Sequence, residues 1–200
     1  MYRDHTCGQL RKTDVGKEVL LSGWVARRRN LGSIVFIDLR DRYGITQLTF
    51  DEAHSELVKD VRNEYVLQVK GKVQLKEVAN PKLSTGEIEV LADECRVLSK
   101  SKTTPMIIAD ETDALEETRL KYRYLDIRRN PIKEKLILRD KVTTIVRSIL
   151  HEDDFVEVET PILSKSTPEG ARDYLVPSRL YNGRFYALPQ SPQIYKQLLM

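Results

Sequence analysis

The sequence predicts a fold in two parts, a small barrel made of β-strands followed by a region that mixes helices and strands. Within the first hundred residues, apolar and polar residues alternate over short runs, which is typical of half-buried strands. A polar stretch over 99–105 ends in proline and marks a boundary. Beyond Pro131 the apolar residues recur at helical spacing along one face.

Five strand-like runs and one helical run make up the first part. The strands are expected over 19–25, 34–39, 45–50, 65–73 and 88–97, with the helix over 53–64. Leu57 and Val61 lie four residues apart, which favours that helix. Three strands, a helix and two strands is the order of an OB-fold, a small Greek-key barrel. The pattern alone also suits other small barrels.

The remaining sequence divides by composition. Residues 104–119 follow the polar boundary and are expected to form a hinge with a short helix. Residues 120–129 are aromatic and basic, with helical character. We therefore predict a barrel domain over 1–103, a hinge over 104–119 and the first part of an α+β domain over 120–200.

A long helix opens the last of these parts. Asn130 and Pro131 favour a helix start, with asparagine as the N-cap and proline at the first helical position. The helix is expected to end near Asp153. Alternating residues over 155–160 then predict a strand that Pro161 closes.

Composition limits the possible functions. The chain has 33 basic and 30 acidic residues and a net charge of +3, so its overall charge does not indicate nucleic-acid binding. Its apolar runs are too short to span a membrane, and its first residues have no apolar signal region, so a cytoplasmic location is expected. Cys7 and Cys95 have no ligand partner at metal-binding spacing, and no metal site is predicted.

One motif of the barrel points to nucleic acid. The basic run Arg27–Arg29 follows the first predicted strand, and Phe36 lies in the second. Barrels of this type hold single strands with cations on the phosphates and an aromatic ring on a base. The residues alone favour the alternative, a solvated charge run beside a core phenylalanine.

The first hundred residues resemble the anticodon-binding domain of bacterial-type aspartyl-tRNA synthetases. The matching segments are 23–25, 27–29, 31–33, 36–41, 44–47 and 85–90. The resemblance implies that Phe36 stacks on the central anticodon uridine and that Gln47 hydrogen-bonds the edge of that base. It also implies that Glu89 contacts the neighbouring anticodon base and that Arg29 contacts the anticodon loop.

The second half resembles the start of a class II synthetase catalytic domain. The long helix with 155–161 is similar to the first signature motif of that class, which implies a homodimer interface that includes Pro161. The residues alone also allow the apolar helix face to cover the chain's own sheet. Family members often have glycine where this chain has Asp154, so we expect the helix end to be shaped differently.

Residues 166–179 resemble the mobile loop that closes over aspartate in the same family. The resemblance implies that Glu169 reads the α-ammonium group of the substrate and that Gln193 also contacts the amino acid. It implies that Lys196 pairs with the side-chain carboxylate. A lysine at that place would separate aspartate from asparagine, because the neutral amide leaves a buried ammonium unpaired.

The resemblance implies the activity of an aspartate–tRNA ligase, with tRNA(Asp), L-aspartate and ATP as partners. It implies ATP and Mg²⁺ as cofactors of the full-length enzyme. The second and third class II motifs, which supply the arginines that clamp ATP, do not occur within the 200 residues. We therefore expect this length of chain to be an N-terminal fragment that binds tRNA without catalysis. The alternative is a stand-alone OB-fold module that binds tRNA or other single-stranded RNA.

Overall fold

The computed structural model describes residues 2–167 and 172–200. The chain forms two compact units, one up to Leu136 and one from Ile137 onward. The division between them falls within a single long helix. The boundaries of the three predicted domains, 1–103, 104–119 and 120–200, do not coincide with this division, and the domains stay a prediction.

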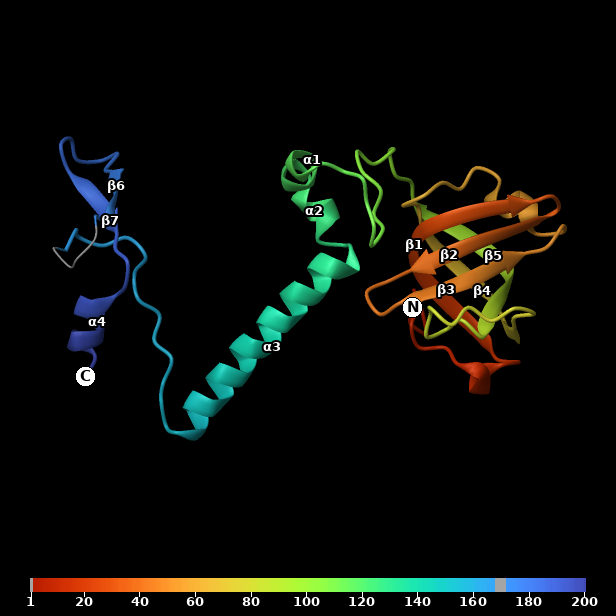
Figure 1. Cartoon of the computed structure of the whole chain (residues 1–200), viewed down its shortest axis with the longest axis horizontal. Coiled ribbons are helices and arrows are strands. Elements are labelled where there is room, and N and C mark those ends of the chain that lie inside the picture. Colours follow the sequence, from red (N-terminus) through yellow and green to blue (C-terminus); the bar gives the residue numbers. More distant parts are fainter. Residues whose placement is uncertain (1, 168–171) are drawn as a thin grey trace. The chain divides into compact units, whose positions relative to one another are not determined.

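Five strands of the first unit close into a barrel (Figure 1). They are β1 (Glu18–Leu31), β2 (Ile34–Arg40), β3 (Ile45–Phe50), β4 (Val66–Leu75) and β5 (Ile88–Ser99). The order around the barrel is β1-β2-β3-β5-β4, and β4 pairs back onto β1. Only β3 and β5 run parallel, and the other neighbours are antiparallel. This arrangement confirms the predicted OB-fold.

The core fills the inside of the barrel and follows the predicted alternation. On β1 the buried side chains are Val19, Leu21 and Val25, and β2 continues the pattern. The larger buried residues of the other strands are Val35, Ile37, Leu39, Leu48, Phe50, Leu67, Val69, Val73, Ile88 and Val90. Fully burying one such side chain contributes roughly 1.5–3 kcal/mol. The side chains between these buried residues on the same strands point outward and can contact a ligand.

Two local features allow the barrel to close. Strand β1 is long enough to pair with both β2 and β4, and a bulge between Val25 and Arg27 bends it between the two pairings. At Gly71, a Cβ atom would lie 2.1 Å from the backbone oxygen of Leu91. Only glycine lets β4 approach β5 so closely, and the pairing register shifts at the same point.

The helix expected over 53–64 is wrong. The segment forms only a 3-10 turn over Ser55–Val58. Val58 and Val61 are buried, whereas Leu57 is exposed. The two valines that pack on the barrel are three residues apart, and a tight turn with three residues per turn brings both to the core. The four-residue spacing of Leu57 and Val61 therefore did not predict which side chains pack against the barrel.

Three helices follow the barrel, α1 (Glu116–Lys121), α2 (Arg123–Asp126) and α3 (Asn130–Glu152). The predicted helix start at residues 130–131 is confirmed, but the predicted cap is wrong by one residue. The carbonyl of Arg129 accepts the first helical hydrogen bond, from Lys133, and the Asn130 side chain instead donates to Asp110. None of the described helices is long and apolar enough to cross a membrane.

Helix α3 ends with the left-handed turn that glycine usually provides. Asp154 has a φ of 63°. The N–H of Phe155 donates to the carbonyl of Leu150 at 2.9 Å, and that of Asp154 to His151 at 3.2 Å. These two bonds form a Schellman motif. The expectation that aspartate would reshape this helix end is wrong, because the two hydrogen bonds hold Asp154 in a conformation that its side chain disfavours.

The second unit contains β6 (Tyr174–Pro177), β7 (Phe185–Leu188) and α4 (Gln193–Leu198). The two strands pair antiparallel, and Ser164 adds a single bridge to Ala187. The strand expected over 155–160 is wrong for this structure. Its alternation is real, but the described part of the chain offers it no neighbouring strand, and Phe155 and Val156 are exposed. A strand needs a hydrogen-bonding partner as well as a pattern.

Candidate nucleic-acid interface

The outer face of the barrel gathers all four residues predicted to contact an anticodon. The cross-strand register places Arg29 of β1 opposite Phe36 of β2, and Phe36 opposite Thr49 of β3. On the same sheet, Asp38 faces Gln47, and Glu89 of β5 faces Gln74 of β4. Phe36, Gln47 and Glu89 are half-buried. Five strands therefore contribute to one continuous polar surface around one aromatic ring.

Arg29 is the cationic centre of this surface. Its guanidinium donates to Oδ1 of Asp38 at 2.8 Å and to Oε1 of Gln47 at 3.3 Å. Its central carbon lies 5.8 Å from the centroid of the Phe36 ring. The Nε–H group of Arg29 is buried and has no hydrogen-bond partner among the described residues. A buried donor without a partner is costly.

Glu89 is the anionic centre. Its carboxylate accepts hydrogen bonds from Nε2 of Gln47 and Oγ1 of Thr49, both at 2.7 Å, and from Nε2 of Gln74 at 2.9 Å. Gln47 thus links Glu89 to Arg29 through the two ends of one amide. Each amide atom still has one hydrogen-bonding position to spare, because the nitrogen has two protons and the oxygen two lone pairs. Gln47 can therefore contact a base without leaving the network.

The predicted basic run does not act as one unit. Strand β1 was predicted to stop before Arg27, but it continues through Leu31 and includes all three arginines. Arg27 is exposed, and Arg28 donates from Nε to the carbonyl of Val58 at 3.3 Å. Only Arg29 joins the network around Phe36. Alternation along the strand turns Arg28 to the other face from Arg27 and Arg29, and only Arg29 bonds to Asp38 and Gln47, so the basic run overstated the positive charge of this network.

Sequence reasoning missed four residues of this surface, Asp38, Thr49, Gln74 and Lys76. Burial lowers the pKa of Lys76, and the nearby carboxylates of Glu89 and Asp38 partly offset this. Asp38 and Thr49 were within reach of sequence analysis, because each lies two residues from a predicted contact, Phe36 or Gln47, and so on the same face. Gln74 and Lys76 depend on how β4 lies against β5, which no local pattern reveals.

The second predicted site lies in the unit from Ile137 onward. Gln193 and Lys196 lie three residues apart on α4, which places them on one side of this short helix. Gln193 lines a small cavity of about 140 Å³ together with Thr167 and Tyr195, and Lys196 is exposed. Glu169 lies outside the described residues. The structure therefore places two of the three predicted aspartate contacts on one helix and leaves the third untested.

Hydrogen bonds join two described parts of the predicted loop over 166–179. The carboxylate of Asp173 accepts from Oγ of Ser166 at 2.9 Å and from the N–H of Thr167 at 3.0 Å. Thr167, Asp173 and Gln193 line a further polar pocket. Pro161 is exposed in the segment before this region. Among the described residues, no group of three or more His, Cys, Asp or Glu side chains could hold a metal ion.

Comparison with known families assigns both parts of the chain. Residues 19–98 match the OB-fold nucleic acid binding domain, and residues 115–200 match the tRNA synthetases class II (D, K and N). An asparaginyl-tRNA synthetase from Pyrococcus horikoshii has a similar structure, with a TM-score of 0.81 and 26% identity over 100% of this chain and 45% of that one. The chain is therefore similar to class II tRNA synthetases (D, K and N) in its second part and over its whole length to one solved member.

The curated relatives are aspartate–tRNA ligases, some of them named for tRNA(Asp) and tRNA(Asn) together. An aspartate–tRNA ligase from Flavobacterium psychrophilum is 57% identical over 100% of this chain and 35% of the relative. One from Mycoplasma mycoides is 52% identical over the same shares. An aspartate–tRNA(Asp/Asn) ligase from Thermoanaerobacter pseudethanolicus is 56% identical over 99% of this chain and 34% of the relative. The chain spans about a third of the length of the curated relatives it matches.

Proposed function

We propose that this chain is the tRNA-reading and aspartate-binding part of an aspartate–tRNA ligase. That enzyme joins L-aspartate to ATP, giving aspartyl-adenylate and pyrophosphate, and transfers the aspartyl group to the 3′ end of tRNA(Asp). The observation that carries the proposal is the network of Arg29, Gln47 and Glu89 around the Phe36 ring. High identity to aspartate–tRNA ligases along the whole chain supports it.

The barrel surface has the chemistry to read an anticodon. The ring of Phe36 offers a stacking platform for the central uridine, and stacking provides affinity that does not depend on the base. The Gln47 amide can satisfy both a donor and an acceptor on the edge of uracil. The Glu89 carboxylate can accept a hydrogen bond from the amino group of a neighbouring cytosine. Arg29 holds these groups together, and its partly exposed guanidinium offers a positive charge to the loop backbone.

The aspartate site is assigned to Glu169, Gln193 and Lys196. Lys196 would pair with the side-chain carboxylate, while Glu169 and Gln193 would bind around the α-ammonium group. An ammonium opposite a carboxylate rejects the neutral amide of asparagine, because that amide leaves the charge without a partner. Gln193 and Lys196 lie on the exposed side of α4, where a ligand can reach them.

ATP and Mg²⁺ belong to the reaction of the whole enzyme. Mg²⁺ supplies charge neutralisation on the phosphates during adenylate formation. The described residues show no group of carboxylates, histidines and cysteines that fits the ion. Adenylate formation is therefore not assigned to residues of this chain. For these 200 residues alone we expect anticodon binding and no ATP–pyrophosphate exchange above background.

The enzyme is proposed to act as a homodimer in the cytoplasm. Helix α3 exposes a stripe of apolar side chains that includes Leu138, Val142 and Ile145, each more than half exposed. Phe155 and Val156 continue the exposed apolar surface toward Pro161. Apolar surface of this extent calls for a partner. A second copy of the enzyme, contacting through the first class II motif, is the partner proposed.

One titration tests the proposal. The chain is mixed with the anticodon stem-loop of tRNA(Asp), and with the same stem-loop carrying a replaced central uridine, at one fixed salt concentration. Tighter binding of the native loop supports a barrel that reads sequence. Equal, purely salt-dependent binding of both loops would contradict the proposal and would leave only a general single-strand binder.

A further inference from the structure

The chain that leaves the barrel contributes little apolar packing. Of residues 104–119, all of which the structure describes, only Met106 is buried, and Ile107 and Leu115 are largely exposed. A groove of about 470 Å³ lies between this segment and the barrel, and both charged side chains, such as Arg40 and Glu64, and apolar ones, such as Ile107, line it. Because Met106 is the one buried side chain of this stretch, polar contacts contribute much of its attachment.

The first of these contacts centres on Glu64, beside the barrel wall. Glu64 is 8% exposed and has a φ of 65°, a conformation that a non-glycine residue rarely adopts. Its two carboxylate oxygens lie 3.1 and 2.9 Å from one guanidinium nitrogen of Arg40 on β2. The guanidinium of Arg128, in the turn before α3, lies 3.6 Å from the same carboxylate and 4.7 Å from the ring centroid of Trp24 on β1. Glu64 and Trp24 thus join the barrel to Arg128.

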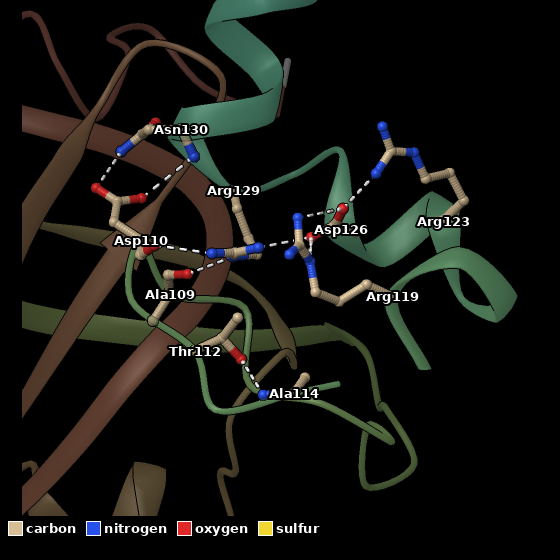
Figure 2. Close-up of polar contacts among 9 residues, drawn as sticks. All are labelled: Ala109, Asp110, Thr112, Ala114, Arg119, Arg123, Asp126, Arg129 and Asn130. Carbon is tan, nitrogen blue, oxygen red and sulfur yellow. Dashed lines mark hydrogen bonds and ion pairs between the residues drawn. The ribbon is translucent and has the colours of Figure 1, made fainter. Parts of the chain in front are cut away.

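The second contact centres on Asp126 (Figure 2). This carboxylate is fully buried and is surrounded by three guanidinium groups. Arg119 of α1 donates to it at 3.1 Å and Arg129 at 2.7 Å, while Arg123 contacts its other oxygen. Asp126 and Arg129 order the elements that carry them, because the Arg129 side chain is only 7% exposed and neither of these two charges is readily satisfied elsewhere.

Arg129 and Asn130 connect this cluster to the chain that leaves the barrel (Figure 2). Arg129 donates from Nε to the carbonyl of Ala109 at 2.7 Å and from a terminal nitrogen to that of Asp110 at 2.8 Å. Asn130 donates to the Asp110 carboxylate through its backbone at 3.2 Å and its side chain at 2.9 Å. Arg40 also donates to the carbonyl of Ile108, at 3.4 Å.

We propose that Glu64 and Asp126 are positioning residues that clamp residues 106–130 to the barrel, so that the barrel and the first turns of α3 move as one rigid body. The predicted hinge is on this view a rigid connector. The role of the clamp rests on the proposed function. If the barrel binds the anticodon of a tRNA, the clamp fixes the orientation of that tRNA relative to the first turns of α3. The clamp itself depends only on the contacts described above.

The test measures geometry in the 200-residue chain. Spin labels are attached at Lys72→Cys on β4 and Lys135→Cys on α3, both exposed, in a Cys95→Ser background, and the distance distribution between them is recorded. The parent should give one narrow distribution. Asp126→Asn should broaden it and should speed amide exchange over 125–132 by about a hundredfold, because Arg129 loses a buried partner. Glu64→Gln should broaden the distribution independently.

Two further variants sharpen the result. Asp113→Asn makes the same chemical change at an exposed position of the same segment and should leave the distribution narrow. Arg129→Lys retains a positive charge for Asp126 but cannot reach both backbone carbonyls, so it should broaden the distribution less than Asp126→Asn. Amide exchange of the barrel strands shows whether Asp126→Asn disrupts the barrel itself. If it does, Arg129→Lys tests the clamp in its place.

The outcomes separate the clamp from the proposed function. An unchanged distribution in both Asp126→Asn and Glu64→Gln would overturn the clamp, as would equal broadening in Asp113→Asn. The stem-loop titration is repeated on the same variants and should give unchanged affinity, because the clamp lies outside the network around Phe36. The distance distribution could broaden in the variants while the parent binds native and altered stem-loops equally. That result would contradict the proposed function and would still support the clamp.

Discussion

The barrel strands and residues 155–160 have the same alternating pattern but adopt different structures. Each barrel strand finds hydrogen-bonding neighbours within the first hundred residues, and its apolar face becomes fully buried. Residues 155–160 find no neighbouring strand in the described part of the chain, and their apolar side chains stay exposed. A local pattern therefore indicates what a segment can form, and the available partners decide whether it does so.

The largest expected effect contrasts two leucines. Leu21→Ala, inside the barrel, should lower the free energy of unfolding by about 2–5 kcal/mol, because Leu21 is fully buried. Leu138→Ala on α3 should cost far less, because Leu138 is 62% exposed. Urea unfolding, followed by the fluorescence of the single tryptophan and by far-UV circular dichroism, measures both. Equal costs would mean that the face of α3 is already covered, as in a dimer.

The next effect compares the two faces of the barrel through two phenylalanines. Phe36→Ala on the outer face should weaken binding of the anticodon stem-loop by about 1–3 kcal/mol through lost stacking. Phe50 is fully buried on the inner face, and Phe50→Ala should instead destabilise the fold by about 3–5 kcal/mol. Titration and unfolding of both variants test the pair. Wild-type affinity in Phe36→Ala would show that the binding face has been assigned wrongly.

A smaller effect concerns selectivity. Gln47→Ala should cost less affinity than Phe36→Ala, but it should reduce the preference for a central uridine, because it removes the amide that reads the base edge. The substitution also removes the hydrogen bonds that the Gln47 side chain makes to Arg29 and Glu89. The ratio of affinities for native and altered stem-loops is the measurement. An unchanged ratio would assign base reading to another residue of the network.

A pH effect should distinguish the connector from the barrel. Burial raises the pKa of Asp126, but hydrogen bonds from Arg119 and Arg129 outweigh this and hold it below its usual value. The stabilisation is therefore complete above the pKa of the unfolded carboxyl, about 4, and is lost as the pH falls through the lower folded value. Amide protection over 125–132 should stay constant down to about pH 5 and fall below about pH 4. Asp126→Asn should abolish this step, and a step that persists would have another origin.

The smallest effect concerns the end of α3. Asp154→Gly should stabilise this helix end by about 1 kcal/mol, because glycine adopts the left-handed conformation without steric cost. Asp153→Gly, one residue earlier and without a positive φ, should not stabilise it. Thermal unfolding monitored by circular dichroism compares the two variants. A destabilised Asp154→Gly would mean that the aspartate side chain makes a contact that offsets its backbone strain.

Much of the fold was predictable because its signals are local. Alternation and a β-branched apolar run identified the five barrel strands, and the turn between β2 and β3 is local as well, since the Asp41 carboxylate accepts hydrogen bonds from the N–H groups of Tyr43 and Gly44. The start of α3 and its apolar face were also correct. The resemblance to a synthetase family pointed to Arg29, Phe36, Gln47 and Glu89 one at a time, and their roles stay predictions.

The sequence by itself determined the elements of the barrel, the family and the residue types available for binding, because side-chain period and turn chemistry act over a few neighbouring residues. Only the tertiary structure decided that Thr49 and Gln74 hold Glu89, that Arg28 leaves the network, and that Glu64 and Asp126 anchor the connector. These outcomes depend on cross-strand register and on the meeting of distant charges, which are long-range properties of the fold.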